Sequence, residues 1–218
     1  MYPVILGSVL FIRYRWKVLA AFLALNVLMF FIRGNGIALR SIKRILLMVE
    51  QPCSWPGNHC LASFAHEMVR LGHLSPGREV MFTKALSLAV VLVFTAAFLW
   101  VVVRIKPRVP STFSIAEAGL IGMAFQLMSL LPSTSHDYKL PIHIIPFLLM
   151  ITRNKADFTI PKGLAYALMA ALSASMAFIF VPFFLIKTFG VIASFIIYAI
   201  FVFSAPRVSS LTAAGRSV

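Results

Sequence analysis

The segment Ala85–Val103 is nineteen residues long and contains no charged side chain. A helix rises about 1.5 Å per residue, so a helix of this length nearly spans the roughly 30 Å hydrocarbon core of a bilayer. A soluble domain needs a charged outer shell, and this segment supplies none. The sequence therefore predicts an integral membrane protein.

Further apolar runs of this kind recur along the chain. Of the 218 residues 61% are hydrophobic and 12% are charged, against roughly 25% charged residues in soluble domains. Leu, Phe and Met are mixed with Ala, as in helices that pair all their backbone groups within lipid. We predict an all-α, polytopic transmembrane helix bundle of about seven apolar helices, some short or re-entrant. The runs are Met1–Ile12, Val18–Ile32, Ala85–Val103, Ile115–Leu131, Leu140–Ile151, Leu164–Ile186 and Phe189–Ala205.

Basic residues gather at every second junction between these runs. The positive-inside rule puts these groups on the cytoplasmic side of the cell membrane. It puts the loops 33–84 and 132–140 on the extracytoplasmic side. The short outer connections carry only Lys139 and Lys187, whereas loop 33–84 holds seven basic residues, as long loops follow the rule poorly. The groups are Arg13, Arg15 and Lys17, then Arg104, Lys106 and Arg108, then Arg153, Lys155 and Lys162, and finally Arg207 and Arg216.

The formal net charge of +14 first suggests a nucleic-acid-binding protein. The Lys and Arg residues, however, are divided among the junctions instead of lining one face, so we interpret them as topology signals and contacts with membrane lipids. No nucleic-acid partner is expected. We predict a single transmembrane domain over residues 1–208 and a disordered tail over residues 209–218.

The loop 33–84 leads into an amphipathic stretch, Leu61–Leu71, which predicts a helix at the membrane interface. If Asn58 caps this helix, His59, His66 and Arg70 share one side of it, and that side could meet an anionic head group. The alternative is that the histidines lie at the aqueous boundary while Arg70 snorkels. Cys53 and Cys60 could form a disulfide, and the alternative is that both are unpaired thiols.

A polar cluster interrupts the apolar sequence between two predicted helices. It consists of His136, Asp137, Tyr138 and Lys139, and Pro141 follows it. Ionisable groups this close to hydrocarbon are costly and are functional candidates, and Lys139 could bind a phosphate. The alternative is an ordinary loop with an internal pair of Asp137 and Lys139.

Several kinds of site are excluded by spacing. The pair His66-Glu67 is not a zincin motif, because Arg70 occupies the position of the second histidine. Glycine-rich phosphate loops, nucleophile elbows and acidic metal clusters are not found in the sequence, so we expect no metal and no cofactor. Glu117 is the only acid well inside a long apolar run, and because it lies near the basic cytoplasmic end of that run, we interpret it as structurally paired.

The order of three motifs resembles a known family. They are Arg13-Tyr14-Arg15-Trp16-Lys17, then Asn58-His59-Cys60-Leu61 with Cys60 in place of the expected serine, and then the stretch Leu131–Leu140. Over residues 1–205 the chain resembles the carboxyl-terminal part of polytopic glycosyltransferases of the C superfamily, family 87, which are similar to polyprenyl-phosphate-mannose-dependent mannosyltransferases.

The resemblance implies transfer of a hexose, mannose by expectation, from a polyprenyl-phosphate donor to a lipid or glycan acceptor on the extracytoplasmic face. It further implies that the lipid-linked sugar contacts the polar residues of both stretches. The family's catalytic acid, in its first extracytoplasmic loop, has no counterpart here, so the catalytic residue is unknown and we expect a fragment of a longer enzyme. The implied donor- or acceptor-binding residues are His136, Asp137, Tyr138, Lys139, Asn58, His59, His66 and Arg70.

Two alternatives from other classes remain. In a small transporter or channel subunit, the segment from His136 to Lys139 would line a polar pathway. In a non-catalytic membrane subunit, the same residues would bind a second polytopic chain.

Overall fold

The computed structural model describes residues 60–104, 115–131, 143–153, 161–176 and 184–204, together with single residues between 17 and 43. Every secondary-structure element in these ranges is a helix, which confirms the all-α class for this part of the chain. The elements are α4 (Leu61–Arg70), the short 3₁₀ helix η1 (Pro76–Arg78), α5 (Glu79–Arg104), α6 (Ile115–Leu130), α7 (Ile144–Arg153), α8 (Lys162–Met176) and α9 (Phe184–Ser204).

Two stretches of the described chain, Pro76–Val103 and Leu185–Ser204, are long and apolar enough to cross a membrane. Helix α5 has 26 residues, or about 39 Å at 1.5 Å per residue, because it continues beyond the predicted apolar run through Lys84 to Glu79. Helix α6 is apolar but has 16 residues, about 24 Å. Helix α7, with 10 residues, is about 15 Å long, so it is short, as expected of the fifth run.

Helices α6 and α9 pack antiparallel and very closely. The start of α6 meets the end of α9, where a Cβ atom on Gly119 would lie 2.9 Å from Cγ2 of Val202. One turn further along α6, Gly122 faces the ring of Tyr198, which lies one turn earlier in α9. The two glycines let the helix backbones approach, as small residues do in membrane helix pairs.

The opposite end of α9 gathers α8 and α4. A Cβ atom on Gly190 would lie 2.5 Å from the backbone nitrogen of Ser175, so the last turn of α8 meets the first turns of α9. The ring of Phe64 in α4 packs edge-on against Phe189, with 5.2 Å between ring centroids. We call this the α4 end of the bundle.

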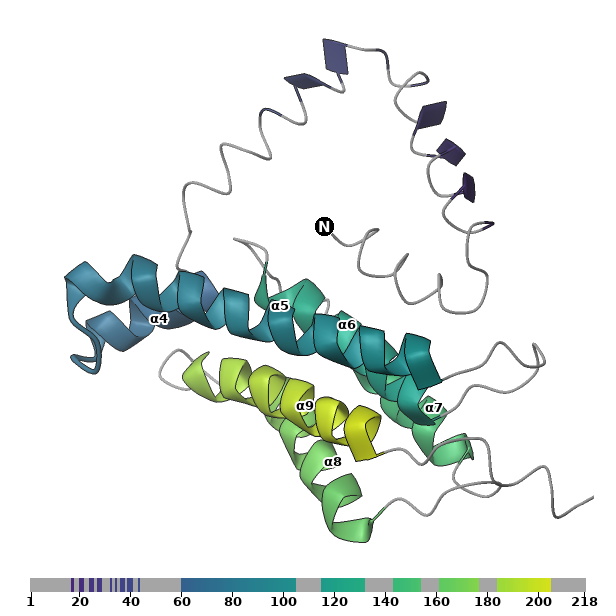
Figure 1. Cartoon of the computed structure of the whole chain (residues 1–218). Coiled ribbons are helices and arrows are strands. Elements are labelled where there is room, and N and C mark those ends of the chain that lie inside the picture. Colours follow the sequence, from purple (N-terminus) through teal and green to yellow (C-terminus); the bar gives the residue numbers. More distant parts are fainter. Residues whose placement is uncertain are drawn as a thin grey trace, which may run out of the picture.

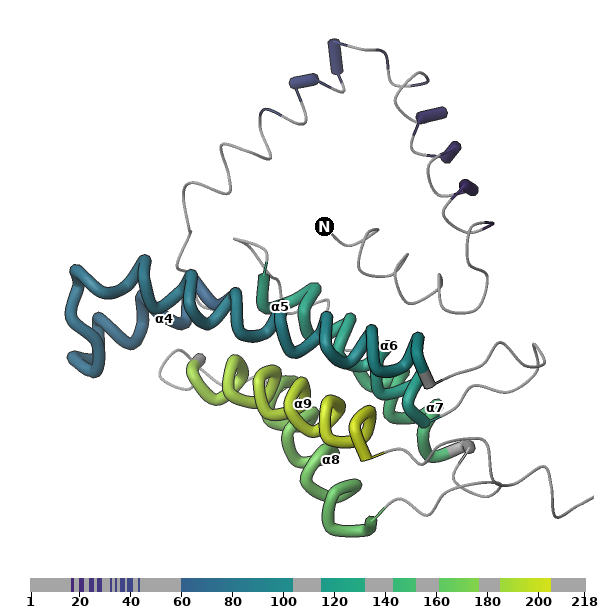
Figure 2. The backbone as a smooth tube through the Cα atoms, in the orientation of Figure 1, coloured from purple at the N-terminus to yellow at the C-terminus, as the bar shows by residue number. Residues whose placement is uncertain are grey.

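Helix α9 forms the centre of the bundle, where it packs against α4, α5, α6 and α8. Figure 1 shows α5 and α9 side by side along their lengths, and Figure 2 traces α8 toward the start of α9. The core is apolar and largely formed by α6 and α9. Its fully or almost fully buried members include Leu120, Met123, Leu127, Val191, Phe195, Tyr198 and Val202.

The division between the sixth and seventh apolar runs was predicted wrongly. We expected one helix over Leu164–Ile186 and a connection at Lys187, but α8 ends at Met176 and α9 begins at Phe184. Lys187 lies inside α9 and is 6% exposed, and Thr188 is fully buried. In the sequence, a lysine between two apolar runs suggests a connection exposed to water. Whether the lysine is buried depends on the helices that pack around it.

Candidate functional site

Two of the residues predicted to bind donor or acceptor, His66 and Arg70, belong to the described part of the chain, on α4. The prediction of a helix here is confirmed. The other six lie outside the described residues, as does Cys53 of the possible disulfide. These six are Asn58, His59, His136, Asp137, Tyr138 and Lys139.

The N-terminal cap of α4 is Cys60 and not Asn58, so the condition under which His59, His66 and Arg70 would share one side of the helix is not met. The backbone N–H of Ser63 donates to Sγ of Cys60 at 3.3 Å, and Cys60 has extended backbone angles. Cys60 is fully buried, as is nearly all of Leu61. The start of α4 is therefore capped by a buried thiol, which accepts a hydrogen bond from an otherwise unpaired N–H of the first turn.

The polar side of α4 carries two side chains that each contact a glutamate. His66 Nδ1 lies 3.3 Å from Oε1 of Glu79, which ties α4 to the first turn of α5. Arg70 Nε donates to Oε2 of Glu67 at 2.6 Å within α4. The Arg70 side chain is 58% exposed. Since a guanidinium has five N–H donors, the bond to Glu67 leaves others for an anion.

A buried polar cluster that the sequence analysis missed joins α6, α7 and α9. Oγ of Ser129 and Nε2 of His143 are hydrogen-bonded at 2.9 Å, and the hydroxyl of Tyr198 donates to the backbone oxygen of His143 at 3.4 Å. Ser129 and His143 are 1% and 2% exposed. The available signal was a histidine inside the predicted apolar run Leu140–Ile151, since a polar group within such a run needs a buried partner.

This cluster fixes both ends of the connection that carries the predicted polar residues. The connection 132–142 starts just beyond Ser129 and Leu130 at the end of α6, and it ends at His143. Because α6 runs antiparallel to α9, the end of α6 lies toward the α4 end of the bundle. The two ends of this connection are therefore held together between the level of Tyr198 on α9 and the end of the bundle where His66 and Arg70 lie.

Gln126 is a second buried polar residue on α6, and it is fully buried. Its carboxamide oxygen and nitrogen form no hydrogen bond to any residue that the structure describes. The side-chain hydroxyls of Thr188 and Ser194 on α9 are in the same condition within these ranges. Unpaired buried polar groups are costly, so this part of the α6 and α9 interface is a candidate polar pathway.

The described ranges contain no gathering of three or more His, Cys, Asp or Glu side chains that could hold a metal ion. Comparison with known proteins finds no family model, no curated protein and no solved structure that matches this chain.

Proposed function

We propose that this chain is a membrane-embedded glycosyltransferase, or the corresponding part of one, similar to family 87 of the C superfamily. It would transfer a hexose, mannose in the first instance, from a polyprenyl-phosphate donor to a lipid or glycan acceptor. The seven apolar segments of the sequence would form its membrane domain. The two apolar stretches of α5 and α9 support this embedding.

One observation carries the proposal: the hydrogen bond between Ser129 and His143. It holds together Ser129 and His143, the described residues that flank the connection 132–142. We infer that this connection, with Lys139, would lie toward the end of the bundle that also presents Arg70. Two polar stretches far apart in sequence would then border one site at the membrane surface. Bringing such stretches together is what a site for a charged lipid head group requires, because neither stretch alone supplies enough polar contacts.

The chemistry of the proposed site follows from the charge that develops on the donor phosphate as the sugar leaves. Cations placed nearby stabilise that charge, and we assign Lys139 and Arg70 to this role. His136, Asp137 and Tyr138 would orient sugar hydroxyls or the acceptor. Asn58, His59 and His66 would complete the border of the site. A general base remains unassigned.

In the proposed orientation, the α4 end of the bundle lies on the extracytoplasmic side of the membrane. Helix α5 ends at Arg104 and α8 begins at Lys162, both at the end of the bundle away from α4. Trp100 and Phe203 mark that end, with 5.8 Å between their ring centroids. A cytoplasmic location of these basic residues agrees with the positive-inside rule.

The test is capture of a photoreactive polyprenyl-phosphate mannose by the full chain in proteoliposomes, followed by measurement of sugar transfer to added lipid acceptors. Capture does not require the unassigned base. We expect Lys139→Ala to lower capture at least about tenfold, the loss of one charge-assisted contact of about 1.5–3 kcal/mol. The control Lys106→Ala, in the opposite basic group, should leave capture unchanged. Equal capture by Lys139→Ala and the unaltered chain would remove the proposed site.

Gln126 favours a second candidate function, a small transporter or channel subunit. Its buried carboxamide lacks a hydrogen-bond partner among the described residues, as a group lining a polar pathway would before its solute enters. Gln126→Leu should then abolish solute flux into proteoliposomes while leaving the folded protein intact. If the chain shows no flux at all, this candidate is excluded and Gln126 is a structural residue.

A further inference from the structure

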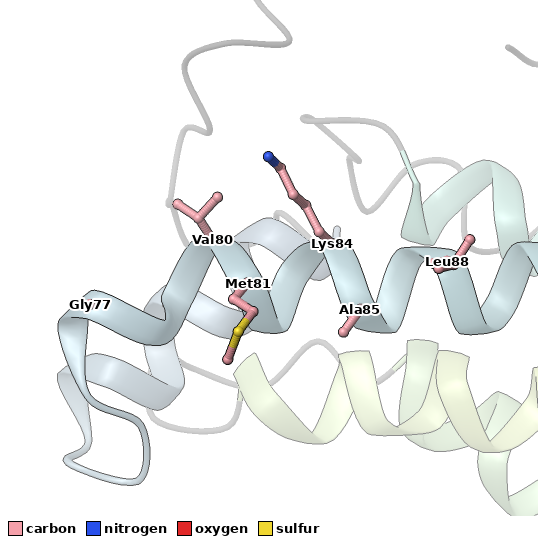
Figure 3. A pocket seen from close by; sticks show the side chains of 6 residues that line it. All are labelled: Gly77, Val80, Met81, Lys84, Ala85 and Leu88. Atoms are coloured by element: carbon pink, nitrogen blue, oxygen red, sulfur yellow. The ribbon is translucent and has the colours of Figure 1, made fainter.

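The outer face of α5 carries a shallow groove at its first turns. It has a volume of about 510 Å³ and is lined by Gly77, Val80, Met81, Lys84, Ala85 and Leu88. Figure 3 shows the Lys84 side chain extending away from the helix, with Val80 one turn before it and Leu88 one turn after it. Five of the six lining residues are apolar or glycine, and the sixth is a cation.

The groove continues into an exposed apolar stripe along α5. Leu88, Leu92 and Leu99 are each more than half exposed, and they follow Lys84 at spacings of four, four and seven residues, which keep them on one side of the helix. The bundle instead covers the opposite side of α5, where Ala97 and Val101 are buried. No charged residue follows Lys84 until Arg104. The stripe thus has a cation at one end and about 30 Å of hydrocarbon-facing surface beyond it.

Lys84 and Arg78 have no carboxylate partner within the ranges that the structure describes. The two acidic residues nearest in sequence are engaged elsewhere: Glu79 contacts His66, and Glu67 contacts Arg70. Lys84 therefore presents an unneutralised charge at the point where α5 changes from polar to apolar. A lysine at such a boundary extends its ammonium toward lipid head groups.

We propose that this groove and stripe hold one anionic bilayer phospholipid. Its phosphate would lie against Lys84, with Arg78 contributing to the local positive potential, and an acyl chain would lie along Leu88, Leu92 and Leu99. Charge complementarity selects this occupant, since a second apolar helix would bring no counter-charge to the ammonium, and a zwitterionic lipid offsets its phosphate with its own cation. The inference rests on the membrane embedding in the proposed function and not on the glycosyl transfer.

The lipid site is separate from the proposed sugar-donor site. Phe82 lies on the side of α5 that faces the bundle, where its ring centroid is 6.3 Å from that of Phe64 in α4. Lys84 lies on the other, exposed side of the same helix. A lipid bound at Lys84 therefore contacts the surrounding bilayer and not the residues assigned to the donor.

The experiment reconstitutes the full chain in nanodiscs of equimolar phosphatidylcholine and phosphatidylglycerol and measures the lipids retained by native mass spectrometry. We expect one phosphatidylglycerol per chain to be retained in preference to phosphatidylcholine. A basic residue near an anionic surface contributes about fivefold to binding, so Lys84→Gln should lower the preference by about that factor. Lys162→Gln, an equal charge change on the exposed start of α8, is the matched control and should leave it unchanged.

Three results would overturn the inference: equal retention of both lipids by the unaltered chain, equal losses in Lys84→Gln and Lys162→Gln, or a dimer without retained lipid. Melting temperatures of the variants verify that each is folded, as expected for exposed lysines. Donor capture is measured on the same samples. Loss of donor capture in Lys139→Ala with phosphatidylglycerol still retained would separate the two sites, so each proposal can fail without the other.

Discussion

Gly122 of α6 lies so close to Tyr198 of α9 that a Cβ atom on the glycine would come within 2.5 Å of Cδ1 of the tyrosine ring. The ring cannot easily move away, because Tyr198 is fully buried and its hydroxyl donates to the backbone oxygen of His143. The close contact of Gly122 with Tyr198, and the bond of Tyr198 to His143, thus couple the positions of α6, α9 and the start of α7.

Gly122→Ala should therefore destabilise the bundle. Forcing a methyl group into this contact typically costs about 1–3 kcal/mol. The measurement is unfolding of the purified chain in mixed micelles as the SDS fraction rises. The control is Gly163→Ala in α8, where a Cβ atom would meet nothing within 4 Å. Identical unfolding curves for both variants would show that α6 and α9 do not pack in this way.

Gly190→Ala should be more damaging than Gly122→Ala. A Cβ atom on Gly190 would lie 2.5 Å from the backbone nitrogen of Ser175 and 2.7 Å from the backbone oxygen of Ala171. Backbone atoms of a packed helix cannot shift without moving the whole helix, so α8 and α9 must separate. We expect the free energy of unfolding to fall by an amount at or above the upper end of the range of about 1–3 kcal/mol, measured in the same micelle titration. The reverse ranking of the two variants would contradict the close approach of α8 and α9.

Ser129→Ala should weaken the closure of the connection 132–142. The substitution removes the hydroxyl that bonds Nε2 of His143, at a site where both residues are almost fully buried. A loss of about 1–3 kcal/mol is expected for a buried polar group deprived of one partner. Hydrogen exchange of backbone amides at the start of α7 should become faster. Ser173→Ala, on the exposed side of α8, is the control for loss of a hydroxyl.

Phe64→Ala should release α4 from the rest of the bundle. Phe64 is 4% exposed and its ring contacts those of Phe82 and Phe189. Removal of a buried phenyl group costs about 3–5 kcal/mol, and the cost falls locally on α4. The expected result is faster hydrogen exchange of the α4 backbone amides than in the unaltered chain, while exchange of the α9 amides stays as slow as before. The comparison variant is Leu71→Ala, since Leu71 is 45% exposed and directly follows α4.

The sequence predicted the helical class and several helix positions because long apolar runs need no knowledge of neighbours. The predicted stretches Leu61–Leu71 and Ile115–Leu131 agree with α4 and α6 within one residue at their ends. The position of Lys187 inside α9 could not be found this way. Lys187 is polar by composition but buried by its surroundings, and periodicity along one helix carries no information about those surroundings.

The candidate site was predicted less completely. Sequence spacing placed His66 and Arg70 on one helix, but their pairing with Glu79 and Glu67 depends on the turn between α4 and α5 and on local side-chain geometry. His143 was passed over because a lone histidine beside prolines has no distinctive spacing, and its partner Ser129 is 14 residues away in the chain. Hydrogen bonds that close a connection become visible only once the flanking helices are packed.

The central place of α9 has a consequence for biogenesis. α9 is the last helix of the described chain to leave the ribosome, yet it covers the glycine face of α6 and the end of α8. If the chain is membrane-embedded as proposed, the buried Gln126 of α6 would face either lipid or the translocation machinery until α9 arrives. We expect the earlier helices to stay associated with an insertase until α9 is made, so that release into the bilayer follows completion of the α6 and α9 pair.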